Sequence, residues 1–387
     1  MTSRERLLAA IDRKPIDRLA VTTHHILPYF LKKYMPGKKI IDFFNKYNAD
    51  AIDWVYDYKA PESTGYYLNP AQKSEMEFLE TRMISSDDWK IDKKVVEEKE
   101  NFRRVEYTIQ TPSGNLTTIL DSNEYTTWVA EPLVKKESDI DIIGKHVTFP
   151  ACDVEAVNAA AENFGDRGII RGHIPTFDLF GQPGCWQDAC CLFGVEKMIM
   201  ATFDDPEWVH TFLGILRDRK IRYVETLKGA AYDIHELGGG DASTTIISPQ
   251  IFRDFVAPYD SAIIEAVHKV DQKVVYHTCG GMMPILEDIA DMGPDAMETF
   301  TPIGMGGDTD LVEAKKRIGN RVCMIGGFDQ GLFFDRATPS ETRQAVRNCF
   351  EQAGKDGGFI LAPSDHFFDA KPALLEAFFD ESLKCTY

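Results

Sequence analysis

The stretch DAMETFTPIGMGGDTDLVEAKKRIGNRVCMIGGFD, residues 295–329, reads as a strand, a helix and a second strand in succession. Short apolar runs at 295–302 and 321–329 enclose the longer amphipathic segment Leu311–Ile318. Strands that are apolar on both faces and alternate with helices are typical of a parallel sheet covered by helices. This unit therefore predicts an α/β protein.

The same alternation extends in both directions along the chain, and Pro249–Val270 and Ser340–Ala353 read as further helices. The other strand candidates are RLAVTTHH (18–25), ADAIDWVY (49–56), GIIRGHIP (168–175), YDIHELG (232–238), KVVYHTCG (273–280) and GGFILAPS (357–364). Eight such units favour a closed (β/α)8 TIM barrel, and the sequence lacks the GxGxxG turn that open doubly wound sheets usually carry. We predict one barrel domain over residues 1–387 with an N-terminal helical extension.

Residues 77–128 interrupt this alternation and predict an insertion into the barrel. DDWKIDKKVVEEKENFRR (87–104) predicts a charged helix. VEYTIQT (105–111) and LTTILDS (116–122) flank the turn Pro112–Ser113–Gly114 and predict a β-hairpin. An insertion of this kind commonly covers the mouth of a site, and a decoration that only packs is equally open.

Composition excludes several classes of partner. The 43 Lys and Arg residues against 61 Asp and Glu give a formal charge of −18, which argues against nucleic acid and anionic membranes as partners. The sequence has no apolar run of the roughly 20 residues that span a membrane, and MTSRERLLAAIDRKPIDR lacks the apolar core of a secretion signal. Eight cysteines without CxxC spacing are expected to be thiols. We expect a cytoplasmic protein.

Polar residues at the predicted strand ends are the candidates for function, because TIM-barrel active sites lie at the carboxyl ends of the strands. His277 and Cys279 are two residues apart on a strand, so their side chains face the same side. One imidazole nitrogen and one thiol sulfur suit a soft divalent ion such as Zn²⁺. HxC alone is a weak motif, and a buried structural pair would show the same spacing.

Neighbouring strand ends add further polar groups. Glu298 and the pair Asp365-His366 would complete a tetrahedral site if they converge with the HxC pair, although a helix cap or a salt bridge is the ordinary role of each alone. Glu236 and Asp241 lie in ELGGGDAS, which lacks the Lys-Ser/Thr ending of a phosphate-binding P-loop. These two acids could bind substrate or a proton, or only hold the loop.

Two further groups follow predicted strands. His24 and His25 are adjacent on a strand and should point apart, which disfavours a second metal site there. A set of aromatic residues near the expected mouth would suit an apolar or aromatic substrate, although core packing is the ordinary role of each. This set is Tyr29, Phe30, Phe177, Phe180, Phe367 and Phe368.

Several landmarks together resemble the uroporphyrinogen decarboxylase superfamily, whose members are (β/α)8 barrels. They are TSRERLLAAIDRKPIDR, SPQIFRDFVAPY, HTCGG, IGGFDQ and GGFILAPSDH, in family order over nearly the whole chain. The decarboxylases carry an arginine-rich RQAGRY motif that holds the substrate's carboxylates. The matching place here reads THHILPYF, without arginine, so the resemblance disfavours that activity.

The corrinoid-linked methyltransferases are the other branch of this superfamily. Their zinc is held by an HxC pair, which His277 and Cys279 match, and by a later cysteine in an APGC-like turn. The corresponding turn here is APSDH, residues 362–366, so Asp365 or His366 stands at or next to the missing cysteine. The resemblance implies zinc ligands among His277, Cys279, Glu298 and His366, with Glu236, Asp241 and Asp365 as catalytic groups.

Exchange of a thiolate for a carboxylate or imidazole leaves a more Lewis-acidic zinc, suited to polarising an ether oxygen. The resemblance thus implies transfer of a methyl group from a small methylated donor, plausibly a methoxylated arene, to cobalt(I) of a corrinoid carried by a partner protein. Glu298, Glu236 or Asp241 would protonate the leaving oxygen. A uroporphyrinogen-type decarboxylase, a methylcorrinoid:thiol or folate methyltransferase, and a barrel that only binds a ligand stay open, as does a homodimer.

Overall fold

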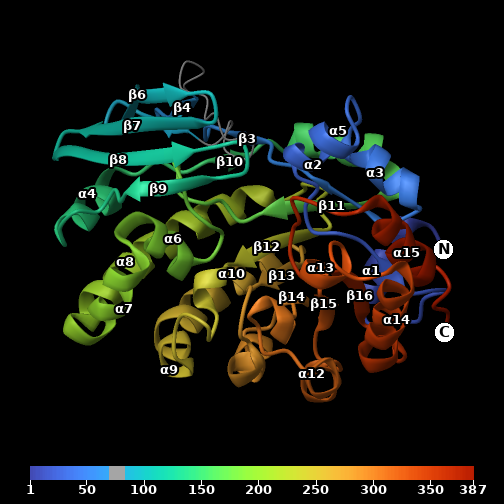
Figure 1. Cartoon of the computed structure of the whole chain (residues 1–387). Helices are drawn as coiled ribbons and strands as arrows, with labels where there is room; N and C mark the ends of the chain where they lie inside the picture. Colours follow the sequence, from blue (N-terminus) through green and yellow to red (C-terminus); the bar gives the residue numbers. More distant parts are fainter. Residues whose placement is uncertain (69–82) are drawn as a thin grey trace.

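Eight parallel strands form one curled sheet with helices on its outside (Figure 1). The computed structural model describes residues 1–68 and 83–387. In sheet order the strands are β1 (Ala20–Val21), β16 (Phe359–Pro363), β15 (Cys323–Phe328), β14 (Ala296–Thr299), β13 (Val274–His277), β12 (Ile234–Gly238), β11 (Gly168–His173) and β2 (Ala51–Trp54). The N–H of Asp50 donates to the carbonyl oxygen of Val21 at 2.8 Å, which joins the segment leading into β2 to β1 and closes the sheet. The predicted (β/α)8 barrel is confirmed, and each strand falls within its predicted stretch.

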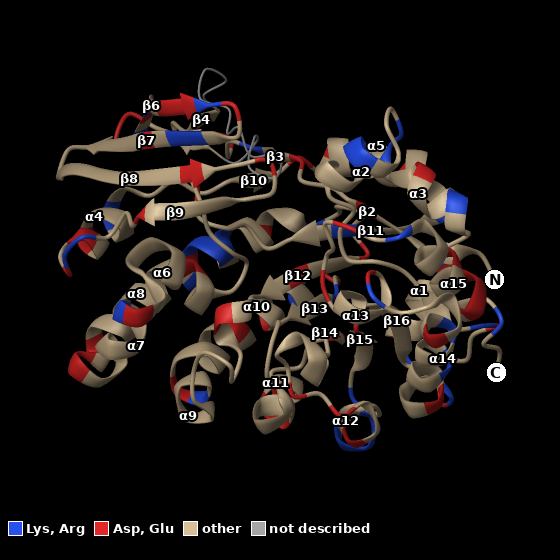
Figure 2. Ribbon diagram, in the orientation of Figure 1, with Lys and Arg blue, Asp and Glu red and all other residues tan. Residues whose placement is uncertain are grey.

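Helices connect the barrel strands on the outside of the sheet. In chain order they are α2 (Pro28–Tyr34), α3 (Ile40–Tyr47), α6 (Cys185–Phe193), α7 (Val195–Asp204), α8 (Pro206–Val224), α9 (Pro249–Ile251), α10 (Ala257–Lys269), α11 (Leu286–Asp291), α12 (Leu311–Ile318), α13 (Gln330–Phe333), α14 (Pro339–Cys349) and α15 (Pro372–Ser382). The three helices predicted between strands are confirmed, two of them including a π-helical turn. Figure 2 shows acidic and basic stretches interspersed over these helices. No helix in the described part of the chain is long and apolar enough to cross a bilayer.

The N-terminal helix α1 (Ser3–Ile11) closes the amino end of the barrel. Thr2 caps it, and its hydroxyl accepts the N–H of Glu5 while the Glu5 carboxylate accepts the N–H of Thr2. Leu7 and Ile11 are buried in a cluster with side chains that point into the barrel. The predicted N-terminal helical extension therefore forms the floor of the barrel.

Side chains inside the barrel lie in layers, because residues two apart on a strand share a face. The apolar layer against α1 includes Ile52, Ile169, Ile234, Val275 and Ala296. Two residues further along the same five strands come Trp54, Arg171, Glu236, His277 and Glu298. A polar layer thus sits above the apolar one, at the carboxyl ends of the strands.

An inserted sheet of four antiparallel strands lies between β2 and β11 in the chain. Its strands are β6 (Lys90–Lys99), β7 (Phe102–Thr111), β8 (Gly114–Ser122) and β9 (Thr127–Glu131). The predicted hairpin is confirmed as β7 and β8, with Thr111 paired to Gly114 across the turn. The insertion was predicted from residue 77, and residues 77–82 lie outside the described part. Shorter elements of the same part of the chain are β3 (Tyr58–Lys59), β4 (Tyr67–Leu68), β5 (Ile84–Ser85), α4 (Asp139–His146) and β10 (Ala151–Cys152). The helix α5 (Val154–Phe164) follows them and packs against β11 on the barrel.

The charged helix predicted over 87–104 is wrong, because most of that stretch forms β6. This strand pairs with β7 from Lys90 opposite Gln110 to Lys99 opposite Phe102. Ile91 is buried while most other β6 side chains are exposed, so the strand tolerates the charges that suggested a helix. Pairing with a neighbouring strand outweighs the local preference of the sequence.

Candidate metal centre

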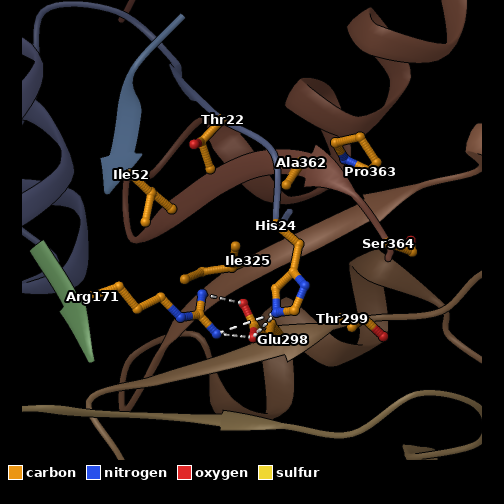
Figure 3. A pocket seen from close by; sticks show the side chains of 10 residues that line it. All are labelled: Thr22, His24, Ile52, Arg171, Glu298, Thr299, Ile325, Ala362, Pro363 and Ser364. Atoms are coloured by element: carbon orange, nitrogen blue, oxygen red, sulfur yellow. Dashed lines mark hydrogen bonds and ion pairs between the residues drawn. The ribbon is translucent and has the colours of Figure 1, made fainter. Parts of the chain in front are cut away.

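The side chain of Arg171, on β11, lies in the middle of the polar layer and is 2% exposed. Its Nη1 donates to Oε2 of Glu298 at 3.0 Å (Figure 3). Its Nη2 donates to Oε2 of Glu236 at 2.5 Å. The guanidinium carbon lies 4.3 Å from the ring centroid of Trp54, a cation–π contact. One buried positive charge therefore joins two carboxylates from different strands.

His24 enters the same cluster from the segment after β1. Its Nε2 lies 3.1 Å from Oε2 of Glu236 and 3.2 Å from Oε1 of Glu298. The ring of His25 stacks on Trp54, with centroids 4.1 Å apart, and meets the ring of His24 edge to face at 4.4 Å. The expectation that these two neighbours point apart is therefore wrong, because residues 22–25 do not continue the strand. His24 was not among the predicted site residues, and the structure places it in the centre of the site.

His277 and Cys279 face the same point at the end of β13. Nε2 of His277 lies 3.0 Å from Sγ of Cys279, and that sulfur lies 3.0 Å from Oδ2 of Asp365 at the end of β16. The other ring nitrogen of His277, Nδ1, lies 2.9 Å from Oε1 of Glu298. One nitrogen, one sulfur and one oxygen thus converge, with a carboxylate behind the imidazole.

The two glutamates of this cluster stay ionised. Burial favours their neutral forms, but Arg171 and His24 outweigh it and hold the pKa values of Glu236 and Glu298 well below the usual range. Burial also opposes protonation of His24, yet the charges of Glu298 and Glu236 raise its pKa. The two ionised carboxylates of the polar layer therefore favour a protonated His24 beside Arg171.

Burial and the neighbouring charges also shift the pKa values of His277, Cys279 and Asp365. Burial disfavours a charged His277, but Cys279 and Glu236 outweigh it and its pKa rises well above the usual value. Burial raises the pKa of the Cys279 thiol, and His277 offsets this only in part. Burial acts against an ionised Asp365, but the hydrogen bond from His366 and the charge of His277 hold its pKa well below the usual range.

The donor set of His277, Cys279 and Asp365 fits a zinc ion. Their ligand atoms lie within 4.8 Å of one another, and nitrogen, sulfur and oxygen are the donors that zinc takes in proteins. A metal-bound histidine usually directs its second nitrogen at a carboxylate, as His277 does toward Glu298. The sequence predicts Glu298 as a ligand. In this geometry Glu298 lies where it can orient the imidazole of His277.

A second set, His24, Glu236, His277 and Glu298, is equally close together. Arg171 and His24, whose pKa is raised, supply the counter-charges of its two carboxylates, and Arg171 would repel a metal ion there. The charge of this second set is therefore balanced from within the protein.

The remaining predicted residues lie at the edge of the site. Nδ1 of His366 is 2.9 Å from Oδ1 of Asp365, and its side chain is 39% exposed. Asp241 follows β12, where its N–H donates to Gln187 and its carbonyl accepts the indole N–H of Trp186. No metal-binding group among the described residues includes Asp241, and burial raises the pKa of its carboxyl.

Arg171 and His24 are the site residues that sequence reasoning missed. In the stretch Ile169–His173, Arg171 follows Ile169 by two residues, so the alternation that places Ile169 inside the barrel also places the arginine there. His24 and His25 lie beyond the end of β1, and both rings contact Trp54, so alternation along a strand could not identify His24.

A small pocket lies inside the barrel, lined by residues of β2, β11, β14, β15 and β16 and of the segment after β1. Figure 3 shows His24, Arg171 and Glu298 on one side and Ala362, Pro363 and Ser364 on the other. Thr22, Ile52, Thr299 and Ile325 complete its lining. Hydrogen-bonding and apolar groups thus meet directly behind the predicted metal ligands.

A profile of the family described as uroporphyrinogen decarboxylase (URO-D) matches residues 159–382, more than half of the chain. Uroporphyrinogen decarboxylase of Psychromonas ingrahamii is 28% identical over 209 residues, which cover 50% of this chain and 54% of that protein. The methylated-thiol–coenzyme M methyltransferase of Methanosarcina mazei is 27% identical over 188 residues, 48% of this chain and 47% of that protein. The chain thus spans about half the length of the curated relatives it matches.

The fold extends beyond this matched part. A solved methyltransferase from Methanosarcina mazei superposes with a TM-score of 0.59 at 16% identity, over 99% of this chain and 98% of that one. At that identity the likeness shows a shared barrel fold alone. The profile match over more than half of the chain shows that the chain belongs to the uroporphyrinogen decarboxylase family.

Proposed function

We propose that this protein is a zinc-dependent methyltransferase that moves a methyl group from a small methoxylated arene to the cobalt of a corrinoid carried by a separate protein. The proposal rests on one observation, the convergence of His277, Cys279 and Asp365 at the carboxyl ends of two barrel strands. The methyltransferase among the relatives supports this class of reaction. The decarboxylases among them make decarboxylation the alternative to exclude.

The charges at the site favour methyl transfer over decarboxylation of a polycarboxylate. Such a substrate needs cationic side chains that are free to pair with it. Arg171, the arginine within the polar layer, already pairs with Glu236 and Glu298. The donor expected here is therefore a neutral molecule.

The protein's own residues would hold and orient the metal. His277 and Cys279 would bind from β13 and Asp365 from β16, while Glu298 fixes which nitrogen of His277 carries the proton. Arg171 in turn holds Glu298 in place. Zinc bound here would act as a Lewis acid toward the donor's ether oxygen.

A leaving phenolate or alkoxide oxygen requires a proton, and the pKa directions narrow the choice of donor. Glu236 and Glu298 stay ionised beside Arg171 and have no proton to give. Burial raises the pKa of Asp241, which lies at the mouth in the loop after β12, so Asp241 retains a proton more readily. We assign the proton transfer to Asp241.

The direct test follows the cobalt spectrum. Purified protein is incubated without oxygen with cobalt(I) cobalamin and, in turn, 1,2-dimethoxybenzene, methanol and methylamine. We expect the cobalt(I) absorption to convert to that of methylcobalamin with the arene. About one zinc per chain should be bound, as for a mononuclear site.

Two cysteine variants give the matched comparison. Cys279→Ser should lose the zinc and the methyl transfer together. Cys191→Ser, a half-buried thiol on α6 outside the metal-binding groups of the described residues, should lose neither. Metal-free protein that decarboxylates uroporphyrinogen would instead establish the alternative function.

A further inference from the structure

Three aromatic side chains from distant parts of the chain meet beside the candidate metal centre. They are Tyr29 on α2, Tyr125 in the β8–β9 turn of the inserted sheet, and Phe368 after β16. The ring centroids of Tyr29 and Tyr125 are 4.8 Å apart, those of Tyr125 and Phe368 5.6 Å, and those of Tyr29 and Phe368 6.4 Å. Two of the three rings follow the strands that lead to His24 and Asp365.

These rings lie outside the continuous core. Phe30 and Phe367, each adjacent to one of them in sequence, point into the core, with centroids 5.3 Å apart. Tyr29 and Phe368 are only partly buried, and the side chain of Tyr125 is 46% exposed. In each consecutive pair of aromatic residues, one ring therefore packs in the core and the other, Tyr29 or Phe368, lies at the mouth.

The turn that presents Tyr125 is fixed by its own hydrogen bonds. Oδ1 of Asn123 accepts the N–H of Tyr125 at 2.9 Å and the N–H of Thr126 at 3.0 Å. The N–H of Asn123 donates to the carbonyl oxygen of Thr126 at 2.9 Å. An Asx turn of this kind holds the exposed ring in position. The inserted sheet thus reaches the barrel mouth through one ordered aromatic side chain.

The aromatic group adjoins the predicted metal ligands. The ring of His366 meets that of Phe368 edge to face, with centroids 5.5 Å apart, and Nδ1 of His366 lies 2.9 Å from Asp365. Phe368 is thus linked to the predicted metal ligand Asp365 through a single side chain, that of His366.

We infer that Tyr29, Tyr125 and Phe368 form the subsite that binds the ring of the methoxylated donor, so that the β8–β9 turn selects arenes. This inference rests on the proposed function. Aromatic walls favour an aromatic ligand through offset and edge-to-face contacts. A quaternary ammonium would also be attracted to such rings, but Lys33 already lies 5.3 Å above Tyr29 and would repel it. The neutral arene is the ligand that fits.

Binding is tested without the corrinoid, by titration of the zinc-loaded protein with 1,2-dimethoxybenzene in a calorimeter. Tyr125→Ala and Phe368→Ala should each weaken binding about three- to tenfold, the range expected for loss of one aromatic contact. Trp128→Ala is the matched control, because this β9 ring is 37% exposed and contacts Phe102 instead. It should leave the arene affinity unchanged, and all three variants should keep their zinc.

The outcomes separate this inference from the proposed function. If the wild-type protein binds no arene, or if Tyr125→Ala binds it as tightly as wild type, the inference is overturned. An equal loss of tetramethylammonium binding in Tyr125→Ala would overturn the selectivity for arenes. If arene binding falls as expected but cobalamin is never methylated, the subsite stands and the proposed reaction fails.

Discussion

Arg171 is the residue on which the arrangement of the polar layer depends. Its guanidinium is buried, lies over Trp54 and contacts the carboxylates of Glu236 and Glu298. A buried charge pair adds little net stability, but removal of one partner leaves the other uncompensated. Loss of Arg171 would therefore remove a counter-charge from both carboxylates.

We predict that Arg171→Met destabilises the protein by roughly 3–5 kcal/mol, because it leaves buried carboxylates without their counter-charge. The double variant Arg171→Met/Glu236→Gln should recover part of this loss, since one of those charges is then absent. Urea unfolding of the single and double variants measures the coupling. If the losses of unfolding free energy in the single variants add up to the loss in the double variant, Arg171 and Glu236 do not interact.

Asp260 on α10 gives a prediction about pH that is independent of the metal centre. Burial raises its pKa to about 6, although the N–H of Cys185 and the hydroxyl of Tyr276 donate to its carboxylate. The folded protein therefore holds a proton that the unfolded chain releases near pH 4. Stability should fall as pH rises from about 4 to about 6, by about 3 kcal/mol for this group.

Asp260→Asn should remove that contribution. The difference in unfolding free energy between wild type and variant, measured at intervals from pH 4 to pH 7, should therefore change with pH and level off above about 6. A difference that is the same at every pH would show that Asp260 does not titrate in this range.

At the scale of single elements, alternation along the strands explains what the sequence could reveal. Buried strands such as Val274–His277 and Phe359–Pro363 are short apolar runs between helices, so all eight were recognisable. The same period of two placed His277 and Cys279 on one side. It also places Arg171 in the same layer as His277 and Glu298, but an arginine flanked by apolar residues offered no sign of its partners.

The structure of residues 90–99 and the surroundings of Glu298 could not be read from the sequence, because both depend on contacts between distant segments. The charges of Lys90–Lys99 suit an exposed helix or an exposed strand equally, and only pairing with Phe102–Thr111 selects the strand. The role of Glu298 depends likewise on Arg171 and His277, which come from other strands. Single residues do not reveal such partners.

Gly238 at the end of β12 tests the packing of this element against β13. Its φ is +105°, and a Cβ atom there would overlap the carbonyl oxygen of His277. We predict that Gly238→Ala costs more than about 3 kcal/mol, because backbone strain and a clash with a neighbouring strand add together. Thermal unfolding measures the loss, and the zinc affinity should fall with it.

Gly229 is the matched control for this substitution. Its φ is +88°, but a Cβ atom there would have no neighbour within 4 Å. Gly229→Ala should therefore cost only about 1 kcal/mol of strain and leave zinc binding intact. Equal losses in the two variants would mean that the contact with β13 contributes nothing.

At the scale of the whole molecule, the site exists only when distant segments are assembled. Arg171 and His277 come from two different strands, Asp365 follows a third, and Tyr125 meets Phe368 from the inserted sheet. The unfolded chain offers zinc no such set of ligands. Zinc binding as proposed would therefore be coupled to folding.

Zinc should consequently stabilise the folded protein against heat. At a free zinc concentration 100 times the Kd, the stabilisation is about 2.7 kcal/mol, and the melting temperature rises accordingly. The same addition should leave Cys279→Ser nearly unchanged, and a chelator should reverse the effect in the wild-type protein. Equal shifts in both proteins would assign the effect to zinc bound elsewhere.

The most direct test of the candidate metal centre is X-ray absorption at the zinc edge of the zinc-loaded protein. We predict one sulfur neighbour at about 2.3 Å and nitrogen or oxygen neighbours at about 2.0–2.1 Å, with the sulfur absent in Cys279→Ser. A zinc shell without sulfur in the wild-type protein, or a protein that takes up no zinc, would contradict this account.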